Sequence, residues 1–146
     1  MATKDFARFT LEKCAFWHGI LTINDSIVTS FFDIKFKKDV PDPDNYIAFV
    51  TNDIPAYPIA VTDNCHVSLN IENNISGNSN KIRVCDVNFS GSELQKMINE
   101  VPNAQNIDVE TDTGEWSFSN QNGQWILRGI SVYIQLSHLR KFVKDA

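Results

Sequence analysis

Short runs of β-branched and aromatic residues occupy the first half of the chain, and turn-forming residues separate them. Such runs are typical of β-strands. No helical pattern lies between them, so the strands are expected to pair mainly antiparallel rather than through βαβ crossovers. The expected strands cover residues 16–23, 26–36, 46–51, 57–62, 66–71 and 81–87, with loops at 38–45 and 72–80.

The clearest turn signal is the dipeptide Asn122-Gly123, which lies between two segments of alternating polarity. Asn-Gly supplies the two positive φ angles that a type I′ turn requires. The segments on either side are therefore predicted to form a tight hairpin. Trp116 and Trp125 are expected to lie near one another across its two strands.

Two apolar stripes with a helical period of 3.6 residues predict short helices. In the first, Ser90 and Glu93 have the spacing of a capping box, and Pro102 prevents the helix from continuing. In the second, Ser137 is the expected cap. The helices are expected at about 90–101 and 137–145, with the apolar residues Leu94, Met97, Ile98 and Val101 in the first and Leu139, Phe142, Val143 and Ala146 in the second.

Together these elements predict an α+β fold, in which a mainly antiparallel curved sheet or partial barrel carries two short helices. At 146 residues the chain fits a single domain, residues 1–146. The order of strands followed by a helix occurs twice, which suggests an internal repeat of residues 57–101 and 105–146. Chance similarity is the alternative, because alternating strands and a capped helix draw on few residue types.

Sequence motifs for catalysis, metal binding and phosphate binding are absent. The three histidines, His18, His66 and His138, are far apart in the chain, and neither GxGxxG nor GxxxxGK[ST] occurs. We therefore expect a protein that is not an enzyme, with no catalytic residues, no cofactor and no metal. A site assembled in space from cysteine, histidine and aspartate is left open, since such partners need not be neighbours in the sequence.

The cysteines and the apolar runs bear on the cellular compartment. Cys14, Cys65 and Cys85 form an odd set without a CxxC pair, which is typical of neither a disulfide framework nor a zinc site. Charged residues interrupt the first fifteen positions, and no uncharged run is long enough to cross a membrane. A cytoplasmic protein with reduced thiols and no membrane contact is expected.

Acidic residues are concentrated in two stretches. The net charge is −5, and neither residues 39–80 nor residues 97–127 contain a lysine or an arginine. A negative surface of this kind accelerates the encounter with a positive partner. Aromatic residues beside the carboxylates are the usual contact anchors. The candidate partner-binding residues are Asp108, Glu110, Asp112, Glu115, Trp116, Trp125, Asp42, Asp44 and Tyr46. Asp108, Glu110 and Asp112 alternate and are expected to share one face of a strand.

The preferred functional hypothesis is a small acidic, non-catalytic protein-binding module. An immunity-type or antitoxin-like inhibitor that covers a basic partner, such as a toxin nuclease, fits the charge pattern and needs no catalytic motif. A sheet with an uncovered edge is also a possible dimer contact, and the sequence leaves the oligomeric state open.

The second hypothesis is binding of single-stranded nucleic acid. In architecture alone, strands closed by a helix and used twice resemble the whirly and PUR types of single-strand-binding domain, with residues 128–132 leading into the tail helix as the relevant segment. The resemblance implies bases stacked on aromatic side chains and phosphates bound by basic residues. Net acidity makes nucleic acid the less favoured partner. The basic residues concerned are Lys35, Lys37, Lys38, Lys81, Arg83 and Arg128.

Overall fold

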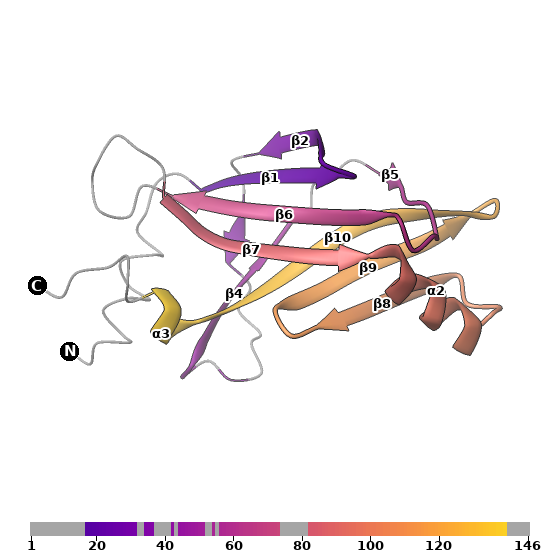
Figure 1. The fold of residues 1–146 in the computed structure, drawn as a ribbon. Coiled ribbons are helices and arrows are strands. Elements are labelled where there is room, and N and C mark those ends of the chain that lie inside the picture. Colours follow the sequence, from indigo (N-terminus) through magenta and orange to yellow (C-terminus); the bar gives the residue numbers. More distant parts are fainter. Residues whose placement is uncertain are drawn as a thin grey trace, which may run out of the picture.

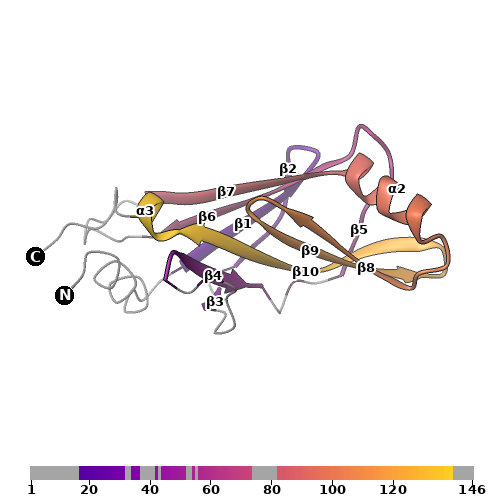
Figure 2. The same cartoon turned by 90° about the horizontal axis from the view of Figure 1, so that it is seen from below.

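A computed structural model describes residues 17–31, 34–36, 42, 44–51, 54, 56–73 and 82–139. Two antiparallel sheets form its two layers (Figures 1 and 2). The first has the strand order β2-β1-β6-β7, with β1 (Trp17–Ile23), β2 (Ser26–Phe31), β6 (His66–Asn73) and β7 (Ile82–Ser90). The second has the order β3-β4-β10-β9-β8. Its strands are β3 (Lys35–Phe36), β4 (Tyr46–Val50), β8 (Asn106–Thr111), β9 (Gly114–Gln121) and β10 (Gln124–Gln135). The short strand β5 (Tyr57–Pro58) also pairs with β10.

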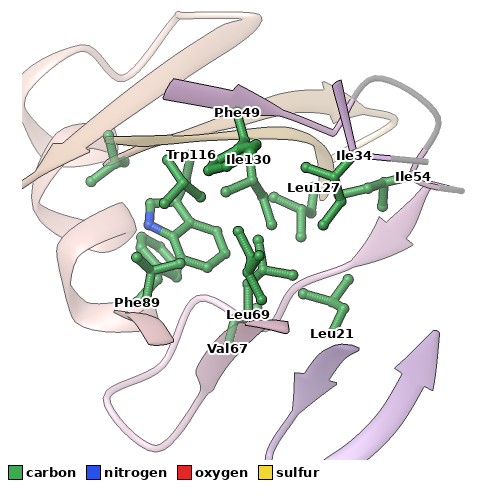
Figure 3. Packing of buried hydrophobic residues seen from close by; sticks show 14 of the residues in the cluster. Leu21, Ile34, Phe49, Ile54, Val67, Leu69, Phe89, Trp116, Leu127 and Ile130 are labelled. Atoms are coloured by element: carbon green, nitrogen blue, oxygen red, sulfur yellow. The ribbon is translucent and has the colours of Figure 1, made fainter. Parts of the chain in front are cut away.

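The core lies between the two sheets. Inward-facing residues alternate with outward-facing ones along β6 and β9, as period-two patterning requires. Ring contacts join the layers: Trp17 of β1 lies 4.6 Å from Phe49 of β4, and Phe89 of β7 lies 5.5 Å from Trp116 of β9, between ring centroids. Figure 3 shows residues of both sheets meeting in this cluster. The arrangement is that of a β-sandwich with one hydrophobic core.

The β1–β2 and β9–β10 hairpins have their turns at the turn-forming residues that the sequence indicates. Asn24 and Asp25 have φ angles of 51° and 67°, and Asn122 and Gly123 have φ angles of 57° and 84°. Positive φ angles at both positions are those of a type I′ hairpin turn. The predicted proximity of Trp116 and Trp125 is wrong, however. The turn pairs Gln121 with Gln124, which places Trp125 opposite Asn120 and Trp116 opposite Ile130, farther along the hairpin.

Helix α2 (Gly91–Glu100) agrees with its prediction to within one residue, and Ser90 occupies its N-cap position. The predicted capping bond is absent. Ser90 has extended backbone angles but makes no side-chain cap hydrogen bond, and its Oγ instead lies 2.6 Å from Ser92 Oγ. Helix α3 (Leu136–Leu139) begins one residue before the prediction, whose remainder, residues 140–145, lies outside the described residues. Neither helix, within the described parts of the chain, is long and apolar enough to cross a membrane.

The mainly antiparallel α+β architecture is confirmed, but a single curved sheet or partial barrel is not. The strands belong to two sheets, because β7 and β8 do not pair with each other and α2 connects them. The two spans of the suggested repeat contain β5, β6, β7 and α2 in one case and β8, β9, β10 and α3 in the other. Residues 59–63 near the start of the first span form no strand, whereas residues 107–111 at the corresponding place in the second span lie in β8. The internal repeat stays a prediction.

Candidate partner-binding surfaces

The two tryptophans that the sequence suggested as partner anchors lie in the core. Trp116 is 0% exposed and Trp125 is 7% exposed. Trp116 packs against Phe89 of the opposite sheet, so its ring is unavailable to another molecule in this fold. Both residues are therefore corrected from candidate contact residues to core residues.

Three of the predicted acidic residues line one groove. Asp108 and Glu110 are exposed on β8, and Glu115 is half-buried on β9 directly opposite Glu110. Helix α2 forms the other side of the groove, which has a volume of about 590 Å³. We call this the acidic groove; its charged lining residues are Glu93, Lys96, Glu100, Asp108, Glu110 and Glu115.

The helix residues of the acidic groove are missing from the sequence-based candidates, although the sequence contained a signal for them. Glu93, Lys96 and Glu100 recur at i, i+3 and i+7, the spacing of one helix face, which borders the apolar stripe that predicted the helix. The sequence thus indicated a charged helix face with two carboxylates, but only the fold places it beside β8.

The charges of the acidic groove are poorly compensated. Five carboxylates and a single lysine line it. Within the described ranges, Lys96 forms no ion pair with any of these carboxylates. Glu110 and Glu115 face each other as a cross-strand pair, and like charges in that position destabilise a sheet. The groove therefore maintains a local excess of negative charge at a cost in stability.

Asp112 does not share the strand face expected for it. Strand β8 ends at Thr111, so Asp112 lies in the β8–β9 turn and not on the face of Asp108 and Glu110. It lines a different cavity of about 610 Å³, together with Tyr46. We call this cavity the tyrosine cleft; its lining includes Tyr46, Arg83, Asp86, Asp112, Tyr133 and His138.

Asp42 and Asp44 lie close to Tyr46, as their sequence positions suggest. They line a pocket of about 380 Å³ that shares Tyr46 and Gln135 with the tyrosine cleft. Asn45 Nδ2 donates a hydrogen bond of 2.9 Å to Asp42 Oδ2, and the backbone N–H of Tyr46 donates one of 3.0 Å to the carbonyl of Asp42. These bonds hold the Asp42 side of the pocket against the start of β4. The predicted residues thus separate into two surfaces rather than one.

Most residues of the tyrosine cleft had no signal in the sequence. Four segments form it: Tyr46 of β4, residues 83–86 of β7, residues 112–113 of the β8–β9 turn, and residues 133–135 of β10 with His138 of α3. They are distant in sequence, and only the packing of one sheet on the other brings them together. Arg83, Asp86, Tyr133 and His138 therefore could not be singled out from spacing alone.

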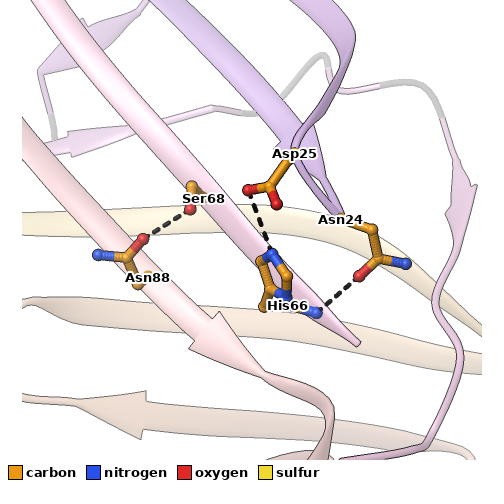
Figure 4. A network of polar contacts seen from close by, with 5 residues as sticks. All are labelled: Asn24, Asp25, His66, Ser68 and Asn88. Atoms are coloured by element: carbon orange, nitrogen blue, oxygen red, sulfur yellow. Dashed lines mark hydrogen bonds and ion pairs between the residues drawn. The ribbon is translucent and has the colours of Figure 1, made fainter. Parts of the chain in front are cut away.

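The histidines lie in separate places, each beside an oxygen atom. His18 Nδ1 lies 3.7 Å from Glu72 Oε2, and His138 Nε2 lies 3.1 Å from the backbone carbonyl of Val84. The ring of His66 lies 3.3 Å from Asp25 Oδ1, and its backbone N–H donates to Asn24 Oδ1 at 3.0 Å (Figure 4). The His66 contacts join the β1–β2 turn to the start of β6 and have the character of surface hydrogen bonds.

Neither described cysteine is activated. Burial raises the pKa of the Cys65 thiol. The pKa of Cys85 is raised to about 11, first by burial and then by the negative charge of Asp86. Within the described part of the chain, no three histidine, cysteine or carboxylate groups are close enough to hold a metal ion. Since the nucleophile of cysteine chemistry is the thiolate, Cys85 is poorly suited to catalysis although it lines the tyrosine cleft.

Alkylation tests this protonation state. At pH 8, iodoacetamide is expected to modify Cys85 in the native protein about a hundredfold more slowly than a free cysteine, because few molecules carry the thiolate. The rate should rise as the pH is raised toward about 11, the pKa of the folded-state thiol. Peptide mass mapping separates Cys85 from the other cysteines, and the urea-unfolded chain is the control. Equal rates in native and unfolded protein at pH 8 would contradict a raised pKa.

No protein-family model, curated protein or solved structure matches this chain.

Proposed function

We propose that the protein is a small acidic, non-catalytic binding module that inhibits a basic protein partner, such as a toxin nuclease, in the manner of an immunity protein or antitoxin. The acidic groove is the observation that carries the proposal. Five carboxylates from α2, β8 and β9 line it with one lysine. A basic partner would relieve the repulsion among them, so the charge pattern that weakens the free protein strengthens the complex.

The negative charge of the surface also favours a basic protein over a polyanion as the ligand. Negative potential accelerates the encounter with a positive surface and slows the approach of nucleic acid. Arg83 and Arg128, two basic residues of the alternative hypothesis, lie in different sheets. Arg128 lines a pocket that also contains Asp108, so its charge is partly offset there.

The test begins with affinity capture from the source organism and binding measurements with the purified partner. Capture of a basic protein whose activity the chain inhibits is expected. The variant Asp108→Asn/Glu110→Gln should lower the association rate about tenfold at low ionic strength and much less at high ionic strength, because salt screens the lost attraction. Both residues are exposed, so the fold should be retained.

The matched control is Asp25→Asn/Asp63→Asn, which removes the same charge from exposed positions away from the acidic groove. It is expected to change the association rate less than twofold. Equal effects of the two variants would show that only net charge matters and would remove the groove from the proposal. Labelled single-stranded DNA should bind no more tightly than about 10⁻⁴ to 10⁻⁶ M; nanomolar binding with a steep salt dependence would favour the nucleic-acid hypothesis instead.

A further inference from the structure

The tyrosine cleft opens where strand β9 begins. Gly114, the first residue of β9, pairs with Val132, and the N–H of Tyr133 donates a hydrogen bond of 2.9 Å to the carbonyl of Thr113, so residues 134–135 of β10 extend beyond their neighbour. On the other side β10 is paired with β4 as far as Gln135. Strand β7 of the other sheet forms the opposite wall, and Figure 2 shows β7 and β10 diverging from α3. The contact of His138 Nε2 with the carbonyl of Val84 closes this end. The cavity is thus a consequence of topology.

Aromatic residues form one wall. Tyr46 pairs with Gln135 and Tyr133 pairs with Ala48, so the two tyrosines are diagonal neighbours on the same face of β4 and β10. Gln135 Nε2 donates a hydrogen bond of 3.2 Å to the Tyr46 hydroxyl, which fixes the orientation of that side chain. Each tyrosine is half-buried and contributes to the lining of the cleft.

Carboxylates from two different segments accompany the tyrosines. Asp86 comes from β7 and Asp112 from the β8–β9 turn, and both are exposed. Neither forms an ion pair or a side-chain hydrogen bond among the residues that the structure describes. Arg83 also lines the cleft but pairs with neither of them in that part of the chain. The neighbouring pocket adds Asp42 and Asp44, so four carboxylates and one guanidinium surround Tyr46.

This combination fits one side chain better than any other. A guanidinium group stacks on aromatic rings and forms paired hydrogen bonds with carboxylates, whereas an ammonium group is a compact charge that does neither as well. The volume of about 610 Å³ lies within the range of pockets that enclose a ligand group. Arginine is also among the residues most often found as an energetic centre of protein interfaces.

The geometry points to the tyrosine cleft as the receptor for an arginine side chain carried by an exposed loop of the basic partner. This inference rests on the proposed function and deepens it. The acidic groove would govern the encounter through long-range attraction, while the tyrosine cleft would select a partner that presents arginine at the right place.

A blocked hexa-arginine peptide is the probe, and ¹⁵N-labelled protein is the reporter. Titration should shift the backbone amide signals of residues 84–86, 112–113 and 133–135 most strongly.

Hexa-lysine should bind about threefold more weakly than hexa-arginine, because an ammonium group gains less from the tyrosine rings. The variant Tyr133→Leu should bring the two peptides to equal affinity, and Asp86→Asn/Asp112→Asn should weaken hexa-arginine binding about fivefold. The dispersion of the ¹⁵N spectrum shows whether each variant is folded.

The matched control is Asp25→Asn/Asp63→Asn, which removes the same charge from exposed positions outside both the tyrosine cleft and the acidic groove and should leave hexa-arginine binding within twofold. The inference would be overturned if the amide shifts were confined to the acidic groove, were spread evenly over the surface, or did not appear at millimolar peptide. Equal binding of the two peptides by the wild-type protein would also overturn it. None of these results touches the proposed function, which stands or falls on the captured partner and its association rate.

Discussion

Replacement of Trp116 by alanine is expected to lower the free energy of unfolding by about 3–5 kcal/mol. The side chain is 0% exposed and lies at the junction of the two sheets, 5.5 Å from the ring of Phe89. Removing it leaves a cavity that both sheets would have to close, and β9, which is paired with a strand on each side, can move little. Urea denaturation should show a lower midpoint with an unchanged slope, because the surface exposed on unfolding changes little.

Two further variants make this prediction specific. Trp116 Nε1 has no hydrogen-bond partner in the described part of the chain, so Trp116→Phe loses packing but no hydrogen bond and should cost less than half as much as Trp116→Ala. Ile27→Ala is the surface control, because Ile27 is 69% exposed, and it should change stability by no more than about 0.5 kcal/mol. If Trp116→Ala lowered the free energy of unfolding by less than 1 kcal/mol, the burial of Trp116 would be contradicted, and the surface position suggested by the sequence would be supported.

Local features of the fold were predictable because neighbouring residues determine them. Asn122-Gly123 sets its own turn, and the helical spacing of Leu94 and Met97, followed by Pro102, sets helix α2. The burial of Trp116 could also be predicted from the sequence. In β9 it alternates with polar residues and shares a face with Phe118, which marks that face as the one turned toward the core.

The sequence did not show which of the two sheets each strand joins. Strand β5 is only two residues long and pairs with β10 across almost seventy positions of the chain. Alternation of polarity shows that a strand has an inner face but does not show which strand lies beside it. The acidic groove was partly predictable because half of its lining residues come from β8 and β9, which are adjacent in sequence. The tyrosine cleft was not, since it depends on β9 beginning too late to cover the end of β10.

The position where β9 begins is itself open to test, because it depends on a glycine. A Cβ atom added to Gly114 would lie 2.2 Å from the carbonyl oxygen of Ser131 and 3.3 Å from Val132 Cα. Both atoms belong to the backbone of the paired strand and cannot rotate away. Gly114→Ala is therefore expected to destabilise the protein by about 3 kcal/mol, at the upper end of the usual cost of overpacking, as measured by urea denaturation.

Gly129→Ala is the matched control, because the nearest atom to an added Cβ there is the Thr51 carbonyl oxygen at 3.7 Å, an ordinary contact. Gly129→Ala should be as stable as the wild-type protein or more stable by up to about 1 kcal/mol, since alanine reduces the conformational freedom of the unfolded chain. Gly114→Ala should also move the β8–β9 turn and with it Asp112, so hexa-arginine binding should weaken in the folded fraction even though no lining residue of the tyrosine cleft is changed. Full stability of Gly114→Ala would mean that β9 does not approach Ser131 this closely, and the end of β10 would then no longer define the cleft.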